Sequence, residues 1–351
     1  MQLLTEKYDV IVVGGGVAGV NAAAEARSVR PSSSVALVAD ESTVYSRPSL
    51  TAAIAGLVNS VDDVAIYSGK SLKDLGITSY FSSKAVSLDS DSRTIVLRSQ
   101  DREEPLKYRR LVLATGSTPA LPRVHGLDLK GVFSAKWIDD ALRLSNAATP
   151  GMRACVVGAG FIGLEVTQAL FRRGLKVTLL EMRPRVLPEL LEPDLSTRVK
   201  EQLERFGVEV LTGSLLKGIH GKSQVKYASV SGRRLKTDLV VFATGVKPNT
   251  ELAVIGKVKL GRTGAIATDQ RMRTNKESIY AAGDCAETLD LVTGKVVYRP
   301  LGTAAARSGV IAGSNAVGKR REYAGYLRRQ YDRIFGIEIV SMGLSTHQAK
   351  T

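Results

Sequence analysis

The sequence has few of the residues that build disulfide frameworks or metal sites. Its 351 residues include only three histidines and two cysteines, Cys155 and Cys285, which are far apart in the chain. Neither cysteine belongs to a Cys-x-x-Cys pair, so the pattern argues against a disulfide scaffold and against a structural zinc site. Two isolated cysteines suit a reducing compartment.

Long hydrophobic runs and a secretory leader are also missing. Apolar stretches such as VIVVGGGVAG are interrupted by glycine, and none approaches the roughly 18 residues that a membrane-spanning helix needs. The N-terminal residues, MQLLTEKYDVIVV, lack the basic start, apolar middle and small-residue cleavage site of a signal peptide. We therefore predict a cytoplasmic protein without a transmembrane segment.

Acidic residues are outnumbered by basic ones. The chain has 34 Asp and Glu against 49 Lys and Arg, and its formal net charge is +15. This charge favours acidic partners through a long-range attraction that salt weakens. Candidates are an acidic electron-carrier protein, a polyanionic small molecule, nucleic acid and anionic lipid. Because the basic residues are spread along the chain, a general effect on solubility is the alternative.

The chain contains two copies of one glycine-rich pattern. Residues 8–27 predict a strand of apolar β-branched residues, a Gly-x-Gly-x-x-Gly turn starting at Gly14, and an alanine-rich helix. Such a turn lets a pyrophosphate approach the backbone at the helix N-terminus. Asp40 and Glu41 end the next predicted strand, where a carboxylate can accept hydrogen bonds from the ribose hydroxyls.

The second copy lies at residues 153–165, where Gly158 opens the turn, and Glu181 ends the strand that follows. One such turn is a weak signal. Two turns, each with a strand before, a helix after and an acid downstream, predict two dinucleotide sites. Two dinucleotides in one chain indicate that electrons pass between them.

Three further segments predict strands that run into glycine turns: RLVLATGSTP (110–119), DLVVFATGVKPN (238–249) and SIYAAGDCAE (278–287). With these five motifs in this order, the chain closely resembles the pyridine nucleotide–disulfide oxidoreductase superfamily of FAD-dependent enzymes over residues 7–347. The resemblance implies an α/β fold of two Rossmann-like, three-layer domains, with the NAD(P)H-binding domain inserted into the FAD-binding domain.

The same resemblance implies domain boundaries. The FAD-binding domain is expected at 1–117 and 246–322, and the NAD(P)H-binding domain at 118–245. Residues 323–351 resemble the opening of the family's C-terminal dimerisation domain, which then stops. Either a separate chain supplies the rest of that domain and is a candidate partner, or dimerisation is lost or altered.

The resemblance also implies which residues bind the two cofactors. The expected cofactor-binding residues are Gly14, Gly16, Val17, Ala18, Gly19, Asp40, Glu41, Arg47, Pro48, Ala114, Thr115, Gly116, Gly158, Gly160, Phe161, Ile162, Gly163, Glu181, Arg183, Ala243, Thr244, Gly245, Gly283, Asp284, Leu301, Gly302, Thr303 and Ala304. Asp284 is expected to hydrogen-bond the ribityl chain of FAD. The helix that follows Leu301 is expected to face the pyrimidine end of the flavin and stabilise its reduced, negative form.

Two residues of the second unit are expected to act at the reacting ring. Glu165 resembles the family residue that binds the nicotinamide carboxamide, with a solvated helix glutamate as the alternative. Phe161 resembles the aromatic residue that covers the flavin and moves aside, with plain core packing as the alternative. Glu181 favours the free 2′-hydroxyl of NADH, whereas Arg183 and Arg185 could accommodate the 2′-phosphate of NADPH. NADH is the predicted nucleotide and NADPH the alternative.

The segment VYSRPSLTAAIAG (44–56) lacks the redox cysteine of part of the superfamily. NADH oxidases and coenzyme A disulfide reductases place a cysteine where Pro48 stands, and the oxidases place a histidine where Val17 stands. The segment instead resembles Tyr-x-Arg-Pro-x-Leu of the rubredoxin- and ferredoxin-reducing branch, from which Thr51 and Ala52 depart. Arg47 is expected to line the flavin or hold an FAD phosphate, with a capped turn as the alternative. Cys155 and Cys285 are expected to be buried and inert.

These features predict an FAD-dependent NAD(P)H oxidoreductase that passes electrons to an external acceptor without an active-site cysteine. The acceptor would be an acidic electron-carrier protein or a quinone-like small molecule, and residues 319–329 form a candidate basic docking patch for it. Nucleic acid is not expected as a partner. One alternative is an enzyme like the NADH oxidases or coenzyme A disulfide reductases with an altered thiol. The other is an NADH-responsive flavoprotein that acts mainly by binding partners.

Overall fold

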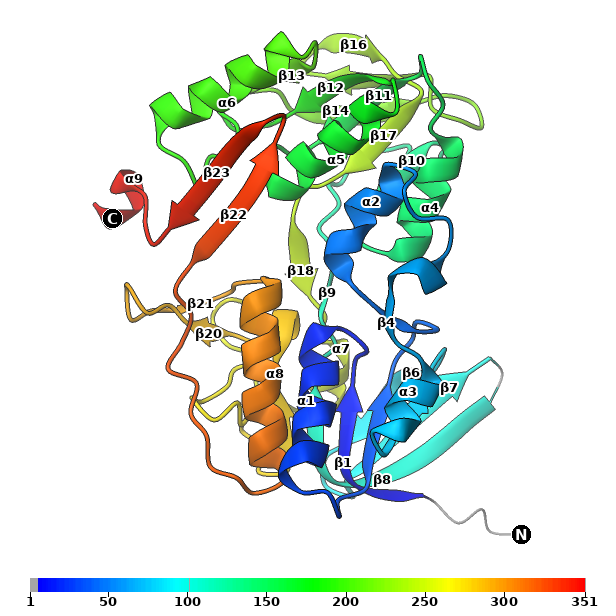
Figure 1. The fold of residues 1–351 in the computed structure, drawn as a ribbon, viewed down its shortest axis with the longest axis vertical. Coiled ribbons are helices and arrows are strands. Elements are labelled where there is room, and N and C mark those ends of the chain that lie inside the picture. The colour runs from blue at the N-terminus through cyan, green and yellow to red at the C-terminus, as the bar shows by residue number, and fades with distance from the viewer. Residues whose placement is uncertain (1–5, 101, 351) are drawn as a thin grey trace. The chain divides into compact units, whose positions relative to one another are not determined.

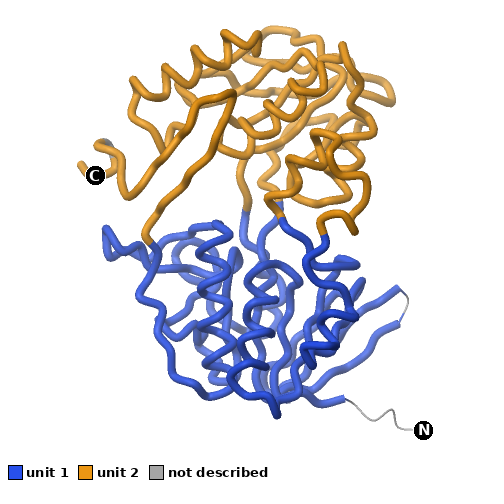
Figure 2. Tube along the Cα trace, viewed as in Figure 1, with its two compact units in different colours: residues 1–46, 65–118, 247–326 blue, residues 47–64, 119–246, 327–351 orange. Residues whose placement is uncertain are grey.

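The computed structural model describes residues 6–100 and 102–350, and the chain divides into two compact units (Figure 2). Unit 1 comprises Met1–Ser46, Ala65–Thr118 and Lys247–Tyr326, and unit 2 comprises Arg47–Val64, Pro119–Val246 and Leu327–Thr351. Each unit contains a Rossmann-type sheet, mixed in unit 1 and fully parallel in unit 2, which confirms the α/β fold class with one domain inserted into the other.

The two compact units group two segments differently from the expected domains, whose boundaries stay a prediction. Residues 47–64 were assigned by sequence to the first domain, but they group with unit 2. The expected C-terminal remnant is divided at residue 326, since Leu327–Thr351 packs with unit 2. Both segments are short, and they pack against residues that are far away in sequence. Local sequence patterns therefore do not predict which unit they join.

Unit 1 is built on a seven-stranded sheet with the order β5-β2-β1-β8-β7-β6 and with β19 beside β8. Its strands are β1 (Lys7–Val13), β2 (Val35–Val38), β5 (Ile77–Tyr80), β6 (Lys84–Asp89), β7 (Thr94–Ser99), β8 (Arg102–Leu113) and β19 (Ile279–Ala281). The long strand β8 pairs antiparallel with β7 through its first half and lies parallel between β1 and β19 through its second half. From Val10 to Val13, β1 is apolar because both of its faces are covered.

Helices α1 (Val17–Val29) and α8 (Gly302–Ala316) lie side by side in unit 1 (Figure 1). Small residues allow this close approach: a Cβ at Gly309 would clash with the carbonyl oxygen of Ala18, and a Cβ at Gly313 would clash with that of Ala22. The remaining elements of unit 1 are β3 (Val44–Tyr45), β4 (Ala65–Tyr67), α3 (Gly69–Asp74), α7 (Glu251–Ile255), η3 (Gly283–Cys285), β20 (Thr288–Leu289) and β21 (Val296–Val297).

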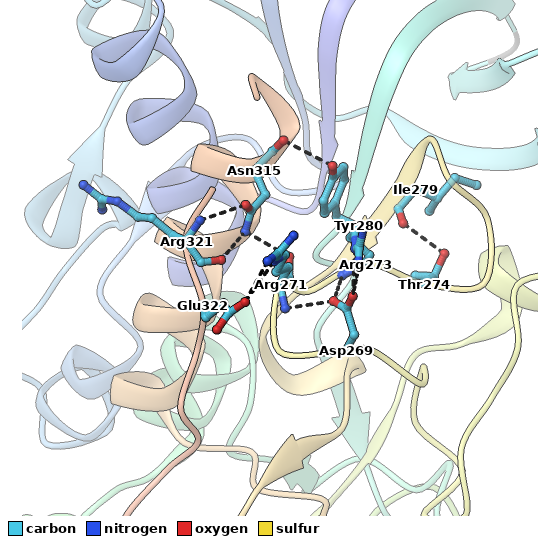
Figure 3. A network of polar contacts seen from close by, with 9 residues as sticks. All are labelled: Asp269, Arg271, Arg273, Thr274, Ile279, Tyr280, Asn315, Arg321 and Glu322. Atoms are coloured by element: carbon cyan, nitrogen blue, oxygen red, sulfur yellow. Dashed lines mark hydrogen bonds and ion pairs between the residues drawn. The ribbon is translucent and has the colours of Figure 1, made fainter. Parts of the chain in front are cut away.

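A polar network anchors the C-terminal end of α8 (Figure 3). The Asn315 side chain donates hydrogen bonds to the carbonyl oxygens of Arg271 (3.1 Å) and Arg321 (2.8 Å) and accepts one from the Arg321 amide (3.0 Å). Tyr280 on β19 donates to the Asn315 carbonyl oxygen at 3.1 Å. Since Asn315 is 8% exposed, this network fixes α8 against the sheet.

Unit 2 is built on a five-stranded parallel sheet with the order β10-β17-β11-β12-β13. These strands are β10 (Val132–Ser134), β11 (Arg153–Val157), β12 (Lys176–Leu180), β13 (Glu209–Leu211) and β17 (Leu239–Phe242). A three-stranded antiparallel sheet comprises β14 (Leu216–His220), β15 (Tyr227–Val230) and β16 (Arg233–Lys236). The apolar side chains of β14 and β15 form one core with those of β11 and β17.

The helices and short elements of unit 2 are η1 (Arg47–Ser49), α2 (Leu50–Ile54), η2 (Val61–Val64), α4 (Ile138–Ala147), α5 (Phe161–Arg172), α6 (Pro193–Arg205) and α9 (Thr346–Ala349). Its last segment forms an antiparallel hairpin of β22 (Arg329–Ile334) and β23 (Ile337–Met342). The chain passes between the units at β9 (Ser117–Pro119) and β18 (Val246–Pro248), among other points. No helix within the described residues is long and apolar enough to cross a bilayer.

Candidate functional site

The first glycine turn connects β1 to α1 in unit 1 and leaves room for an anion. Gly14 has φ +123°, and a Cβ at this position would clash with the carbonyl oxygen of Ala114. A Cβ at Gly19 would clash with the carbonyl oxygen of Gly14, whereas a Cβ at Gly16 would meet nothing within 4 Å. Gly16 is the N-cap of α1, which has no side-chain cap and no acidic residue in its first turn. The first amides of α1, including those of Val17 and Ala18, are therefore available to a phosphate.

Of the two acids after β2, the structure holds one in place. Asp40 is exposed, whereas Glu41 is half-buried and accepts a hydrogen bond of 2.5 Å from the Tyr45 hydroxyl. Tyr45 is 7% exposed, so it fixes the Glu41 carboxylate from a buried position. Tyr45 begins the Tyr-Ser-Arg-Pro segment, in which the sequence drew attention to Arg47 and Pro48.

The Gly283–Asp284 turn lies against the start of α1 within unit 1. Gly283 has φ +78°, and a Cβ there would lie 2.6 Å from the Cβ of Ala18. Its amide donates to the Ser308 hydroxyl of α8 at 3.0 Å. The Ser117 hydroxyl donates to Oδ2 of Asp284 at 2.9 Å, which orients the carboxylate that was expected to bind the ribityl chain.

Sequence reasoning missed three side chains around this turn: Ser117, Ser308 and Tyr298. The Tyr298 hydroxyl is buried, and burial together with the nearby Asp284 carboxylate raises its pKa. Tyr298 directly precedes the Arg-Pro-Leu-Gly start of the helix that was expected to face the flavin, and this proximity to a predicted motif is the signal that could have identified it. Ser308 is buried on α8, six residues after Gly302.

The N-terminal end of α8 presents backbone amides. Leu301 is its N-cap, no side chain caps it, and its first turn contains no acidic residue. Gly302 and Thr303 are exposed, while Ala304 is buried. The Thr303 hydroxyl lies 3.0 Å from the hydroxyl of Tyr326.

The two Ala-Thr-Gly turns form reciprocal backbone contacts, each within its own unit. In unit 1, the Thr115 hydroxyl donates to the Asn249 carbonyl oxygen (2.7 Å) and the Asn249 side-chain amide donates to the Thr115 carbonyl oxygen (2.8 Å). The Asn249 amide also donates to the carbonyl oxygen of Gly116. In unit 2, the Thr244 hydroxyl donates to the Ala120 carbonyl oxygen at 2.7 Å. These turns are thus fixed at the carboxyl ends of β8 and β17.

The second glycine turn, which lies in unit 2, has the same features as the first turn. Gly158 has φ +105°, and a Cβ there would clash with the carbonyl oxygen of Ala243. A Cβ at Gly163 would clash with the carbonyl oxygen of Gly158, whereas a Cβ at Gly160 would meet nothing within 4 Å. Gly160 is the N-cap of α5, and no side chain caps this helix end. Phe161 and Ile162 begin α5, and the Ile162 side chain is 50% exposed.

Glu181 is held tightly at the tip of β12. It is 8% exposed, and its two carboxylate oxygens accept hydrogen bonds from the Ala159 amide and the Arg183 amide, both at 2.8 Å. The Arg183 side chain points elsewhere, since its guanidinium forms an ion pair with Glu189. The structure therefore places a carboxylate, rather than an arginine, beside the second glycine turn.

Glu165 lies on the first turns of α5 and does not stand alone in the solvent. Burial, together with the neighbouring Asp332 of β22, raises the pKa of Glu165 to about 8. Asp332 was not among the residues that the sequence singled out.

Arg47 is engaged within unit 2. Its guanidinium donates to the Lys136 carbonyl oxygen at 2.6 Å and lies 4.7 Å from the centre of the Trp137 ring. The adjacent Pro48 is exposed. The expected contact of Arg47 with FAD stays a prediction.

Both thiols are inaccessible. Cys155 and Cys285 are 0% exposed, and the Cys285 sulfur lies 3.3 Å from the carbonyl oxygens of Leu113 and Ala282. Burial raises the pKa of Cys155 to about 12 and also raises the pKa of Cys285. A buried thiol with a raised pKa is a poor nucleophile. The described part of the chain also brings no three His, Cys, Asp or Glu side chains together as metal ligands.

Comparison with known proteins places this geometry in a family. Residues 8–305 match the family described as pyridine nucleotide-disulphide oxidoreductase. An NADH oxidase of Methanocaldococcus jannaschii is 35% identical over 97% of this chain and 77% of its own. The structure of an NAD-dependent persulfide reductase from A. fulgidus aligns with a TM-score of 0.94 and 35% identity, over 97% of this chain and 65% of that one. A ferredoxin reductase from Rhodopseudomonas palustris aligns with a TM-score of 0.89 and 27% identity, over 96% and 83% of the two chains.

The chain thus spans about two thirds of the persulfide reductase and over three quarters of the NADH oxidase. Both glycine turns and the Gly283–Asp284 turn fall inside the matched residues 8–305. The chain belongs to the pyridine nucleotide-disulphide oxidoreductase family of FAD-dependent NAD(P)H oxidoreductases.

Proposed function

We propose that this chain takes electrons from NADH and delivers them to an external acceptor without an active-site cysteine. The acceptor that we favour is an acidic electron-carrier protein, with a quinone-like small molecule as the alternative. The observation that carries the proposal is the state of the thiols: both cysteines are fully buried and residue 48 is a proline. A disulfide or sulfenic acid cycle needs an accessible thiolate, and this chain offers none at these positions.

The residues of unit 1 fit FAD. The open space at Gly16 and the uncapped start of α1 suit a pyrophosphate, because a phosphate there would satisfy the free amides. Glu41, fixed by Tyr45, is the acid that we assign to the ribose, and Asp284, fixed by Ser117, is the one that we assign to the ribityl chain. When bound, FAD supplies the redox chemistry, which is hydride transfer from NADH to the flavin and electron transfer from the flavin to the acceptor.

The residues of unit 2 fit NADH. Gly160 and the uncapped start of α5 suit its pyrophosphate. Each oxygen of Glu181 already accepts one backbone hydrogen bond and retains a further lone pair for a ribose hydroxyl. The buried carboxylate repels a 2′-phosphate, and the nearby Arg183 is paired with Glu189. These observations support NADH over NADPH.

The charge of the chain supports an acidic carrier as the acceptor, although not every basic residue of 319–329 is exposed. The formal net charge of +15 attracts an acidic partner at long range. Within residues 319–329, Arg321 lies 3.1 Å from Glu25 and Arg328 is 5% exposed, whereas Lys319, Arg320 and Arg329 are exposed. The similarity to a ferredoxin reductase points in the same direction.

The experiment that tests the proposal is an anaerobic titration of the purified FAD-containing protein with NADH, followed by its visible spectrum. We expect one NADH per flavin to bleach the spectrum without a long-wavelength thiolate-to-flavin band. The variant with both Cys155→Ala and Cys285→Ala should behave in the same way. Consumption of a second NADH with such a band would overturn the proposal and implicate a thiol.

A second candidate function is the reduction of dioxygen, because an NADH oxidase is 35% identical over nearly the whole chain. Oxygen consumption and carrier reduction, measured with the same protein at equal NADH, separate the two. Turnover with dioxygen that matches or exceeds turnover with an acidic ferredoxin or rubredoxin would favour the oxidase. Much faster reduction of the carrier, weakened by added salt, would favour the carrier.

A further inference from the structure

The three-stranded sheet of β14, β15 and β16 in unit 2 has one face in the core and one face outside it. Ile219 and Ala228 are buried and belong to the core that this sheet shares with β11 and β17. Because successive side chains along a strand point to opposite faces, their neighbours His220 and Tyr227 lie on the outward face, where they are direct cross-strand partners. The outward face therefore carries polar and aromatic side chains from adjacent strands.

The side chains of this outward face hold one another in place. The His220 ring stacks on the Tyr227 ring, with the two centroids 4.5 Å apart and 9° between the planes. The Arg234 guanidinium lies 4.2 Å from the centre of the Tyr227 ring and donates to the Tyr227 hydroxyl at 2.8 Å. The Ser229 hydroxyl lies 2.7 Å from Nε2 of His220. These contacts order the imidazole and the guanidinium in advance, which lowers the entropic cost of binding a ligand.

A second histidine reaches this face from a separate segment of unit 2. Nε2 of His125 lies 3.2 Å from Nε2 of His220, and the two ring centroids are 4.4 Å apart in an edge-to-face arrangement. Gly218 makes room for it, since a Cβ at Gly218 would clash with the His125 ring. The chain contains only three histidines, so two of the three meet at one place. Two protonated imidazoles at this distance repel each other, and an anion beside the pair would favour its protonated form.

The two histidines and Tyr227 line an open pocket of about 520 Å³. Lys222 and Lys226, from the loop between β14 and β15, also line it and are exposed. Neither lysine forms an ion pair within the described residues. Asp128 is the one acidic residue among the described residues that line the pocket. The pocket thus brings two lysines and two histidines together with a single carboxyl group.

The charges around the two histidines are mainly positive. Residues 210–237 include six Lys and Arg and no Asp or Glu. Burial, together with His125 and Arg234, lowers the pKa of His220 below its usual value. A bound anion would offset the repulsion among these cations, so the pocket favours an anionic ligand. The charged groups that the neighbouring elements place on the side of the histidines are Asp128, Lys222, Lys226, Arg234 and Lys236.

We propose that this pocket is a binding site for a phosphate-bearing anion, separate from both glycine turns. Lys222 and Lys226 supply positive charge, and His125 and His220 supply ring N–H donors. None of the residues that line the pocket belongs to either glycine turn, so the site goes beyond the proposed oxidoreductase function. Because the histidine pair takes up a proton when the anion binds, the affinity for the anion rises as the pH falls.

The test follows the histidine ring signals by NMR while sulfate is added to the FAD-containing protein. Saturating NAD⁺ keeps the second glycine turn occupied. Sulfate is the probe because it stays divalent, so any pH dependence comes from the protein. The ring signals are assigned with single His→Gln variants, since the chain has only three histidines. We expect the signals of His125 and His220 to shift saturably, with a sulfate Kd about tenfold lower at about pH 6 than at about pH 8.

Two lysine variants distinguish the pocket from the general charge of the chain. Lys226→Ala removes a charge that lines the pocket and should raise the sulfate Kd at about pH 6 by about tenfold. Lys217→Ala removes the same charge from an exposed position of β14 that does not line the pocket, and should raise the Kd by less than about twofold. Equal weakening by the two variants would overturn the site, because it would show attraction by net charge alone.

The remaining outcomes concern the histidines and the ligand. Signals of His125 and His220 that do not move with sulfate at about pH 6 would overturn the site. The double variant His125→Gln/His220→Gln should bind sulfate with a Kd that no longer depends on pH, and the native pH dependence in this variant would overturn the role of the pair. If that variant does not fold, the comparison of the two lysine variants still tests the site. Tighter binding of glycerol 3-phosphate than of inorganic phosphate, in the same assay, would identify a phosphate ester as the ligand; the reverse order would identify the free ion.

Discussion

The Ser117 hydroxyl donates a hydrogen bond of 2.9 Å to Oδ2 of Asp284, although the two residues are 167 positions apart in the chain. Ser117 is 2% exposed, so this bond is sheltered from water. It fixes the rotamer of the carboxylate that we assign to FAD, at the turn where Gly283 contacts Ala18 of α1.

Removing this hydroxyl should weaken FAD binding. A hydrogen bond to a charged group contributes roughly 1.5–3 kcal/mol, so Ser117→Ala should raise the FAD Kd of the apoprotein by about tenfold or more. The measurement is a fluorescence titration of apoprotein with FAD. The melting temperature of the apoprotein serves as a control for folding, and an unchanged Kd would show that Asp284 is not oriented by Ser117.

The glycines of each turn should separate binding from folding. Gly16→Ala places a Cβ in open space, so we expect a folded apoprotein that has lost FAD affinity. Gly19→Ala forces a clash with the Gly14 carbonyl oxygen, so we expect it to unfold at lower temperature. Gly160→Ala should leave FAD bound and weaken NADH binding. Loss of FAD from Gly160→Ala, with NADH affinity intact, would contradict the assignment of the two turns.

Glu181 should select the nucleotide. Glu181→Gln removes the negative charge and should raise the NADH Kd by about tenfold while lowering the NADPH Kd, since repulsion of the 2′-phosphate is relieved. Isothermal titration with both nucleotides gives the ratio of the two constants. Glu189→Gln is the matched comparison, because it frees Arg183 without touching Glu181. A larger gain in NADPH affinity from Glu189→Gln would make Arg183 the selecting residue.

The half-buried carboxyl group of Glu165 should make folding stability depend on pH. Because burial, together with the neighbouring Asp332, raises the pKa of Glu165 to about 8 in the folded state, its contribution to stability is present at low pH and is lost as the pH rises to about 8. We expect the free energy of unfolding to fall between about pH 4.5 and about pH 8 and to fall less in Glu165→Gln. Denaturant unfolding at several pH values measures this, and equal slopes for both proteins would contradict it.

Asn315 should be important for the stability of unit 1. Asn315→Ala leaves the carbonyl oxygens of Arg271 and Arg321 without their side-chain donor, and each buried group left unsatisfied costs about 1–3 kcal/mol. We expect a lower melting temperature and weaker FAD binding, because α8 is less firmly held. Arg273→Gln, which loses only the exposed ion pair with Asp269, should have a much smaller effect.

Much of the fold and part of the site follow from the sequence. The glycine turns are local features, because the positive φ of Gly14 and Gly158 and the clashes at Gly19 and Gly163 each demand glycine at a fixed spacing. The family assignment follows from the order of these turns, and the comparisons confirm it. The burial of both cysteines also agrees with the expectation, since Cys155 lies in an apolar strand.

The contacts that orient the acidic side chains could not be predicted in this way. Ser117 donates to Asp284, and Asp332 raises the pKa of Glu165, although the members of each pair are distant in sequence. The basic segment at 319–329 was predicted as one patch, but Arg321 lies beside Glu25 and Arg328 is buried. A single sequence contains no signal for such pairings, because each depends on how separate elements dock.

The sequence by itself determined where the backbone turns form, because it places glycines at these positions. Any residue with a Cβ would clash there with a nearby backbone carbonyl oxygen. It also determined that no thiol stands at position 48. Only the tertiary structure decided which neighbour each carboxyl group meets. The charge state of a carboxyl group depends on burial and on nearby groups, and these are properties of the packed chain and not of the residue type.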